Sequence, residues 1–425
     1  MRVLIKDGRI VDPANKINQV LDILTEDNKI FRIGRRIDAK TDITIDAGGK
    51  VVMPGIVDMH VHLREPGRED KETIFSGTKS ALKGGVTSVL AMPNTSPCID
   101  TPEGVRILKG LIAKSAQANV FISAAISKNR LGKVLTDAVK LKKEGVVALT
   151  DDGSSVSDPQ TLLRAFKKAK EQKTLIICHS EDHALSNNGS INLGLMSTRL
   201  GLKGIPRESE YKIVQRDIEL AEKAKARVHI AHVSCKESVN IISRAKRRGV
   251  AVTAETAPHY FALTEEELSG YDTNLKMKPP LRTKEDMEAI RKGLKEGTID
   301  VIASDHAPHT ENEKDIEFDR AEFGVIGLET ELAVSITELL HPGLLDWPEL
   351  VEKLCFNPAK ILGLNKGTLS VGRDADIIIV SPDKEWVVQK EEIVSKSRNS
   401  PFLNRKLKGA ALYTICGGKI VYEAA

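Results

Sequence analysis

The sequence predicts an α/β fold: a (β/α)8 TIM barrel joined to a small β-sandwich domain that both chain termini form. Three observations predict it. Short β-branched runs alternate with amphipathic stretches from Gly55 onward. Strand-like segments with turn dipeptides occur at both chain ends. Polar side chains gather where the central runs end, which is where a barrel builds its active site.

The length and the net charge limit the classes to which this protein can belong. With 425 residues the chain is long for a single core, so one large domain with an appendage, or two to three domains, are expected. A net charge of +4 indicates neither nucleic-acid nor membrane binding. No apolar run approaches the roughly 20 residues that span a bilayer, and no signal-peptide stretch is present, so we expect a cytoplasmic protein. Five scattered cysteines argue against disulfides.

Eight apolar runs are the expected barrel strands. They are Ile56–His60, Thr87–Met92, Val120–Ala124, Val146–Thr150, Leu175–His179, Val228–Val233, Val250–Glu255 and Val301–Asp305. A doubly wound open sheet is the competing interpretation, and the polar residues at the strand ends favour the barrel. We expect this domain to span residues 56–365.

Helices and turns complete the predicted organisation. The patterns predict helices at Asp158–Gln172 and Thr283–Lys295. Hairpin turns are expected at Asp7-Gly8, Asp27-Asn28 and Gly417-Gly418. Residues 1–55 and 366–425 are therefore expected to supply the two parts of the β-sandwich, because chain ends often lie close together.

Histidines at the strand ends indicate a metal site. His60 and His62 are two residues apart in a strand, so both side chains would face one cavity. Alone, such a pair is more often two hydrogen-bonded structural histidines. His179, His232 and Asp305 stand at the ends of other strands, so a metal site becomes the better interpretation of the histidines. These ligands suit a divalent ion, with zinc expected first and manganese or cobalt as alternatives.

The acidic pair after the fourth run has an ordinary and a functional interpretation. Asp-Asp-Gly is common turn chemistry, but a two-metal site needs a bridging carboxylate. We assign Asp152 to the site and Asp151 to the turn. The other histidines are interpreted as structural or unresolved: His183, His229, His259, His306 and His341.

Eight segments in order resemble the dihydroorotases of the amidohydrolase superfamily, in particular the monofunctional bacterial type with a TDDG segment. The segments are MPGIVDMHVHLREPG, LAMPNT, LTDDGSSV, ICHSED, IAHVSC, KPPLRT, ASDHAPH and FGVIGLET. The resemblance implies the reversible, zinc-dependent cyclisation of N-carbamoyl-L-aspartate to dihydroorotate in de novo pyrimidine synthesis.

The resemblance also implies roles for individual residues. His60 and His62 would hold a first zinc ion and His179 and His232 a second, with Asp152 bridging them and Asp305 acting as both ligand and proton carrier. Many relatives bridge their metals with a carboxylated lysine. Thr150-Asp151-Asp152 stands at that point here, so no modified lysine is expected.

The substrate carries a free carboxylate, for which several residues are candidates. Arg64 offers a bidentate guanidinium, although a solvated loop arginine paired with Glu65 or Glu69 is the ordinary interpretation. Asn94 can donate an amide proton and His309 a ring N–H, and His62 is expected to touch the substrate as well. By resemblance, the backbone of Phe323 and Gly324 would contact the ring edge.

One departure from the family pattern, one predicted loop and two alternatives remain. Lys278 stands where the family usually has asparagine, so it is a doubtful ring contact but could attract a carboxylate. Residues 309–320 are predicted to form a mobile loop over the site. The alternatives are another cyclic amidohydrolase (hydantoinase, dihydropyrimidinase or allantoinase), or a non-catalytic homologue that partners aspartate carbamoyltransferase. We also expect a homo-oligomer.

Overall fold

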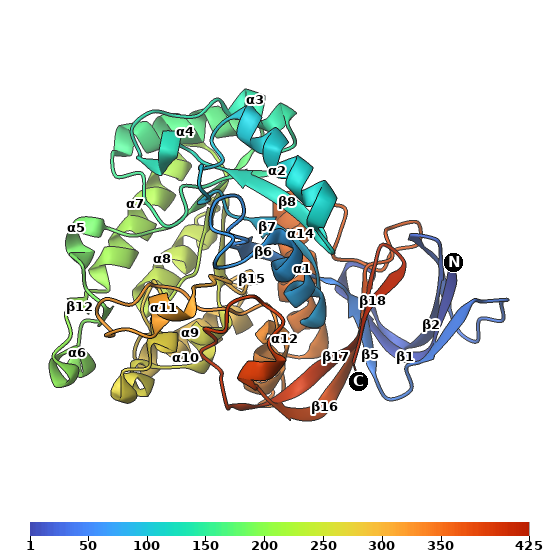
Figure 1. The fold of residues 1–425 in the computed structure, drawn as a ribbon. Coiled ribbons are helices and arrows are strands. Elements are labelled where there is room, and N and C mark those ends of the chain that lie inside the picture. The colour runs from blue at the N-terminus through green and yellow to red at the C-terminus, as the bar shows by residue number, and fades with distance from the viewer. Residues whose placement is uncertain (425) are drawn as a thin grey trace.

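Eight parallel strands form a barrel in the computed structural model of the protein, which describes residues 1–424 (Figure 1). Each predicted apolar run overlaps one of them. The strands are β6 (Ile56–Val61), β7 (Val86–Ala91), β8 (Asn119–Ala124), β9 (Ala148–Leu149), β10 (Leu175–Cys178), β13 (Val228–Ile230), β14 (Val252–Thr256) and β15 (Val301–Ile302).

The first and last barrel strands meet, which distinguishes the barrel from an open sheet. Val61 at the end of β6 pairs in parallel with His306, four residues beyond β15. The amide of His62 donates a 2.9 Å hydrogen bond to the His306 carbonyl. In a doubly wound open sheet these two edges would lie apart, so the predicted (β/α)8 barrel is confirmed.

Helices surround the barrel (Figure 1). They are α1 (Ile74–Lys83), α2 (Pro102–Ser115), α3 (Ala138–Lys143), α4 (Pro159–Glu171), α5 (His183–Ser186), α6 (Leu195–Leu200), α7 (Glu208–Ala224), α8 (Lys236–Arg247), α9 (Pro258–Ala262), α10 (Lys284–Lys295), α11 (Glu311–Lys314), α12 (Glu331–Ser335), α13 (Trp347–Val351) and α14 (Asn357–Leu362). Asp158 caps α4 and Thr283 caps α10 through their side chains, at the predicted boundaries. Within residues 1–424 no helix is both long enough and apolar enough to cross a membrane.

The barrel interior is packed at the end opposite the predicted site. Met59, Leu90 and Ile177 from different strands are buried in one cluster with Ile361 and Leu362 of α14. The Arg227 side chain, just before β13 begins, donates to the Ile361 carbonyl. Helix α14 therefore closes the amino-terminal end of the barrel, which leaves the carboxyl ends of the strands for the site.

Both chain termini join in one sheet of eight strands beside the barrel, as predicted (Figure 1). Its strands are β1 (Arg2–Asp12), β2 (Ile17–Glu26), β3 (Lys29–Gly34), β4 (Ile43–Asp46), β5 (Val51–Pro54), β16 (Ile377–Val387), β17 (Lys406–Cys416) and β18 (Lys419–Glu423). Ile10, Ile23, Ile377 and Ile415 share one buried cluster, so amino- and carboxyl-terminal strands share a core. Two further short strands, β11 (Ile191–Asn192) and β12 (Gly204–Ile205), pair only with each other.

One predicted turn is wrong. Asp27-Asn28 and Gly417-Gly418 connect hairpins, but β1 runs straight through Asp7-Gly8. There the register with β2 shifts, and Asp7 has φ 58°, so the dipeptide forms a β-bulge. A Cβ at Gly8 would lie 2.5 Å from a Val52 methyl group. The Asp-Gly dipeptide suits a bulge as well as a turn, because both conformations need a residue with positive φ and leave little room for a side chain.

Candidate active site

Six predicted ligands converge at the carboxyl ends of five barrel strands. His60 and His62 come from the end of β6, while Asp152, His179, His232 and Asp305 follow β9, β10, β13 and β15. All six are buried. His232 and Asp305 have φ of 34° and 49°, a left-handed backbone that costs free energy and is common at functional sites.

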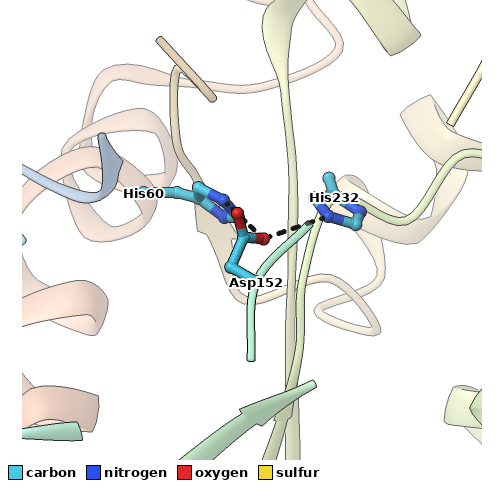
Figure 2. A group of neighbouring side chains, drawn as sticks. All are labelled: His60, Asp152 and His232. Carbon is cyan, nitrogen blue, oxygen red and sulfur yellow. Dashed lines mark ion pairs between the residues drawn. The ribbon is translucent and has the colours of Figure 1, made fainter. Parts of the chain in front are cut away.

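Asp152 lies between His60 and His232 (Figure 2). Its Oδ1 is 3.2 Å from His60 Nε2, 3.5 Å from His179 Nδ1 and 3.8 Å from His232 Nε2. Its other oxygen, Oδ2, is 3.5 Å from His62 Nε2. One carboxylate therefore faces all four imidazoles.

Asp305 forms a second group with the first histidine pair. Its Oδ1 lies 3.5 Å from His60 Nε2 and 3.4 Å from His62 Nε2. Candidate ligand atoms of His60, His62 and Asp305 lie within 4.8 Å of one another, as do those of His60, Asp152 and His232. The arrangement thus has two overlapping groups of candidate ligands.

The unsatisfied atoms of this cluster fit a metal. His60 Nε2 and Asp152 Oδ1 are buried and lack a hydrogen-bond partner, although they lie 3.2 Å apart. Burying such atoms unpaired is costly, and coordination to a cation would satisfy both. Imidazole nitrogen and carboxylate oxygen are donors that suit zinc and related divalent ions.

The electrostatics of the cluster also favour a cation. Burial opposes ionisation of Asp152, but the neighbouring His60, His179 and His232 outweigh it and hold the pKa of Asp152 well below its usual value. For Asp305, His60 and His62 likewise outweigh burial and lower the pKa. Both carboxylates are therefore ionised at neutral pH, the state in which carboxylates bind metals.

The sequence analysis missed Glu255, which orients His60. This fully buried residue of β14 places Oε1 2.5 Å from His60 Nδ1 and Oε2 3.1 Å from His229 Nε2. A carboxylate can only accept here, so Nδ1 of His60 carries a proton, and Nε2 is the nitrogen that faces the site and could bind a metal. A signal existed, because Glu255 ends the seventh predicted strand.

Asn94 orients the second histidine in the same way. Its Oδ1 lies 2.9 Å from His62 Nδ1. With the amide oxygen accepting that proton, His62 Nε2 faces the site and the Asn94 amide group retains its own N–H donors. The predicted substrate residue Asn94 therefore also holds a candidate metal ligand, His62, in place.

The two neighbouring aspartates after β9 have different environments. Asp151 accepts a 3.0 Å hydrogen bond from the Ser127 amide and another from the Ser127 hydroxyl. Asp152 directs its carboxylate to the histidines, and its carbonyl accepts a 2.6 Å bond from the Arg130 guanidinium. Arg130 lines the cavity and was not predicted.

A cavity of about 390 Å³ opens in front of the histidines. Every predicted substrate residue lines it: His62, Arg64, Asn94, Lys278, His309, Phe323 and Gly324. The Arg64 Nε donates to the Pro308 carbonyl at 3.1 Å, and burial lowers the pKa of Arg64 to about 10. Arg64 therefore remains a cation inside the cavity wall, with donors left for an anion.

The turn at Phe323-Gly324 is tightly held. The Gly324 amide donates to the Lys276 carbonyl, while the Gly324 carbonyl accepts from Lys314 and Asn399. Gly324 has φ 134°, and a Cβ there would lie 2.8 Å from the Ala307 side chain. Glycine is therefore needed at this point of the wall because a larger residue would clash.

Lys278 is occupied by an acidic partner. Its Nζ lies 2.7 Å from Glu181 Oε1 and 5.1 Å from the centre of the Phe323 ring. Glu181, which was not predicted, also places Oε2 3.2 Å from His179 Nε2. The lysine thus neutralises a buried carboxylate at the cavity edge.

The remaining histidines have varied environments. His229 is bonded to Glu255 and Thr253, and His306 to Glu72. His259 is buried with an unpaired Nε2, while His183 is half-exposed on α5 and His341 faces the Pro382 carbonyl. All five cysteines are free.

The segment predicted as a loop over the site contains structure. Thr310 caps the short helix α11 through a capping box with Glu313. Lys314 is buried and donates to the carbonyls of Glu322 and Gly324. Through the hydrogen bonds of Lys314, the segment 309–320 is attached to the cavity wall at Glu322 and Gly324.

The fold and the site define a (β/α)8 barrel enzyme of the cyclic amide hydrolase class, with side chains that can hold metal ions. The L-hydantoinase (dihydropyrimidinase) from Arthrobacter aurescens has a TM-score of 0.91 at 28% identity and covers 99% of this chain and 96% of that chain. A D-hydantoinase has a TM-score of 0.88 at 26% identity, with 100% and 95% coverage.

Sequence comparison defines the family. A family model described as Dihydro-orotase-like matches residues 49–238. The dihydroorotase of Elusimicrobium minutum is 51% identical over 423 residues, covering 100% of this chain and 98% of the relative. That of Geobacter metallireducens is 48% identical over 424 residues, covering 100% of both. The chain belongs to the dihydroorotase family, as the sequence motifs predict.

Proposed function

We propose that the protein is a zinc-dependent dihydroorotase that reversibly cyclises N-carbamoyl-L-aspartate to (S)-dihydroorotate and water in de novo pyrimidine synthesis. The observation that carries this proposal is the convergence of four imidazoles and two carboxylates beside a partly buried arginine, Arg64. The full-length similarity to dihydroorotases supports the choice of substrate.

Two zinc ions per chain would fit this cluster of four imidazoles and two carboxylates. His60 and His62 with Asp305 would hold one ion, His179 and His232 the other, and Asp152 faces both groups. Bound there, the metals would supply Lewis acidity for the amide carbonyl and lower the pKa of a water molecule. Glu255 and Asn94 would keep the ligating nitrogens of His60 and His62 unprotonated.

Asp305 would move the proton. Its carboxylate is ionised and lies at the cavity. In the hydrolytic direction it would accept a proton from the attacking water and deliver that proton to the departing ring nitrogen. In the biosynthetic direction it would take the proton from the ureido nitrogen.

Arg64 would bind the free carboxylate of the substrate. Its Nε is used by the Pro308 carbonyl, so the terminal N–H groups remain for a carboxylate. Asn94 and His309 would flank it, while the Phe323-Gly324 turn would face the ring edge. Lys278 would add positive charge near the cavity, reduced by its pairing with Glu181.

A hydantoinase or dihydropyrimidinase activity is the second candidate, because solved hydantoinases share the fold closely. Substrates of that kind lack the ring carboxylate, so a cation at Arg64 in the cavity wall favours dihydroorotate. The test is hydrolysis of dihydroorotate, hydantoin, dihydrouracil and allantoin by the purified protein, with and without added zinc. Opening of hydantoin without turnover of dihydroorotate would overturn the proposal.

We further propose that the protein acts in the cytoplasm as a homo-oligomer, with aspartate carbamoyltransferase as a candidate partner. The complete set of metal ligands supports an active enzyme over a non-catalytic homologue. Light scattering and co-purification would test the assembly. Turnover by the isolated chain would show that activity does not require the partner.

A further inference from the structure

A buried lysine, Lys71, lines the same cavity as Arg64 and His309. Lys71, between β6 and α1, is 3% exposed. Its Nζ lies 3.0 Å from His309 Nδ1 and 2.7 Å from Glu313 Oε1. A buried ammonium group is rare unless its partners compensate for the lost hydration, so these two contacts explain how Lys71 is tolerated.

The contacts of His309 determine which ring nitrogen carries the proton. The Lys71 ammonium can only donate, so Nδ1 is the unprotonated acceptor at 3.0 Å. Glu313 Oε2 is farther from Nδ1, at 3.4 Å, and accepts from the Thr310 amide instead. On the other side, Nε2 lies 2.9 Å from the Phe323 carbonyl, which can only accept. His309 is therefore neutral with its proton on Nε2. Burial and the charges of Arg64, Lys71 and Lys314 agree, since they lower the pKa of His309 to about 2.

This tautomer sets the donors that a substrate would meet. Arg64 Nη2 lies 3.3 Å from His309 Nε2. Two N–H groups cannot bond to each other, so the imidazole does not consume the terminal N–H groups of Arg64. If the proton moved to Nδ1, Nε2 would accept from Arg64 and would lose its bond to the Phe323 carbonyl.

We propose that Lys71 is a positioning residue for substrate binding: it holds His309 in the Nε2–H tautomer and thereby keeps Arg64 free for the substrate carboxylate. The inference rests on the proposed dihydroorotase function for its substrate. The geometry of Lys71, His309 and Phe323 carries it independently of the metals.

Glu313 offers a competing explanation for Lys71, because the lysine also pairs with this residue of α11. If charge neutralisation of Glu313 were the purpose of Lys71, removal of either partner would have similar effects. Arg68 also pairs with Glu313 at 3.0 Å, so α11 keeps a cationic contact without Lys71. The variants Lys71→Met and Glu313→Gln therefore separate the two roles.

The first test reads the tautomer directly. In the zinc-loaded protein with ¹⁵N-labelled histidine, we expect His309 to show a protonated Nε2 and an unprotonated Nδ1, with its signals assigned by their loss in His309→Gln. In Lys71→Met we expect a mixture of tautomers. A wild-type His309 protonated at Nδ1 would overturn the proposal, and this result needs no variant of Lys71 to fold.

The second test is kinetic, with dihydroorotate as the probe. We expect Lys71→Met to raise KM about tenfold, equivalent to about 1.4 kcal/mol, with kcat changed less than about threefold. Glu313→Gln and the control Lys79→Met, at an exposed lysine of α1, should keep KM within about twofold of wild type. An unchanged KM in Lys71→Met, or an equal rise in Glu313→Gln, would overturn the proposal.

The two proposals fail in different ways. If the wild-type protein does not turn over dihydroorotate, the proposed function is wrong, while the tautomer measurement still tests the role of Lys71. If wild type is active and Lys71→Met matches it in both KM and tautomer, only the role of Lys71 is wrong.

Discussion

Replacing Glu255 should weaken metal binding although this residue is not itself a candidate ligand. Its carboxylate lies 2.5 Å from His60 Nδ1, and both side chains are at most 1% exposed. Burial opposes ionisation of Glu255, but its interactions with the neighbouring His60 and His229 hold its pKa far below the usual value. The interaction is therefore a charge-assisted hydrogen bond with little screening by solvent.

The expected loss follows from this geometry. A hydrogen bond to a charged group contributes about 1.5–3 kcal/mol to the stability of the folded protein. Removing the carboxylate partner of a metal-binding histidine typically lowers metal affinity about 10–100-fold. Glu255→Gln keeps an oxygen that can accept from His60 Nδ1 but loses the charge, so we expect about tenfold. Glu255→Ala leaves Nδ1 unpaired, for which we expect about 100-fold.

Zinc dissociation constants measured by competition with a chelator, with metal content checked by elemental analysis, would test this expectation. Asp286→Asn is the matched control because Asp286 is also fully buried but belongs to the capping box of α10, where it bonds to Thr283 away from the histidines. The control should lose stability without losing zinc affinity. A Glu255→Gln protein that binds zinc as tightly as wild type would refute the orienting role of Glu255.

Four further predictions use the same structure. Asp305→Asn should abolish turnover with bound zinc largely retained, so near-normal turnover would remove Asp305 from proton transfer. Asp152→Ala should lower the zinc content per chain by elemental analysis, and unchanged stoichiometry would mean that Asp152 bridges nothing. Arg64→Lys should raise KM for dihydroorotate about tenfold with a smaller effect on kcat, because lysine lacks the guanidinium fork; an unchanged KM would exclude Arg64 as the carboxylate partner. Burial lowers the pKa of His259 to about 4, below the ordinary 6.5, so the unfolded chain binds protons more readily. Up to about 3 kcal/mol of stability should therefore be lost as pH falls from 6.5 to 4, and His259→Gln should flatten that loss in denaturant titrations; an unchanged pH dependence would contradict it.

Much of the fold follows from local patterns. The barrel strands were predictable because buried parallel strands are short runs of apolar residues with polar side chains at their carboxyl ends. Asp158 and Thr283 marked helix starts because their side chains satisfy free amide groups. The turn at Asp7-Gly8 was wrong because the same backbone conformation also occurs in a bulge.

Some residues of the candidate site were predictable from the sequence and others were not. The convergence of the six candidate ligands followed from their common place after strands, whereas Glu255 and Lys71 act through partners far away in the chain. His60 and Glu255 are 195 residues apart, and Lys71 and His309 are 238 apart. No periodicity links residues at such separations, so only folding reveals which ring nitrogens are fixed.

The sequence by itself determined the barrel, the union of both chain ends in one sheet, the family and the residues gathered at the strand ends, because these depend on hydrophobic periodicity and on motifs of a few residues. The tertiary structure alone decided which neighbour each polar atom meets. It directs Asp152 to the histidines and Asp151 to Ser127, pairs Lys278 with Glu181, and places Lys71 against His309. Hydrogen bonds and ion pairs depend on distances of a few ångströms, and only the packed chain sets those distances.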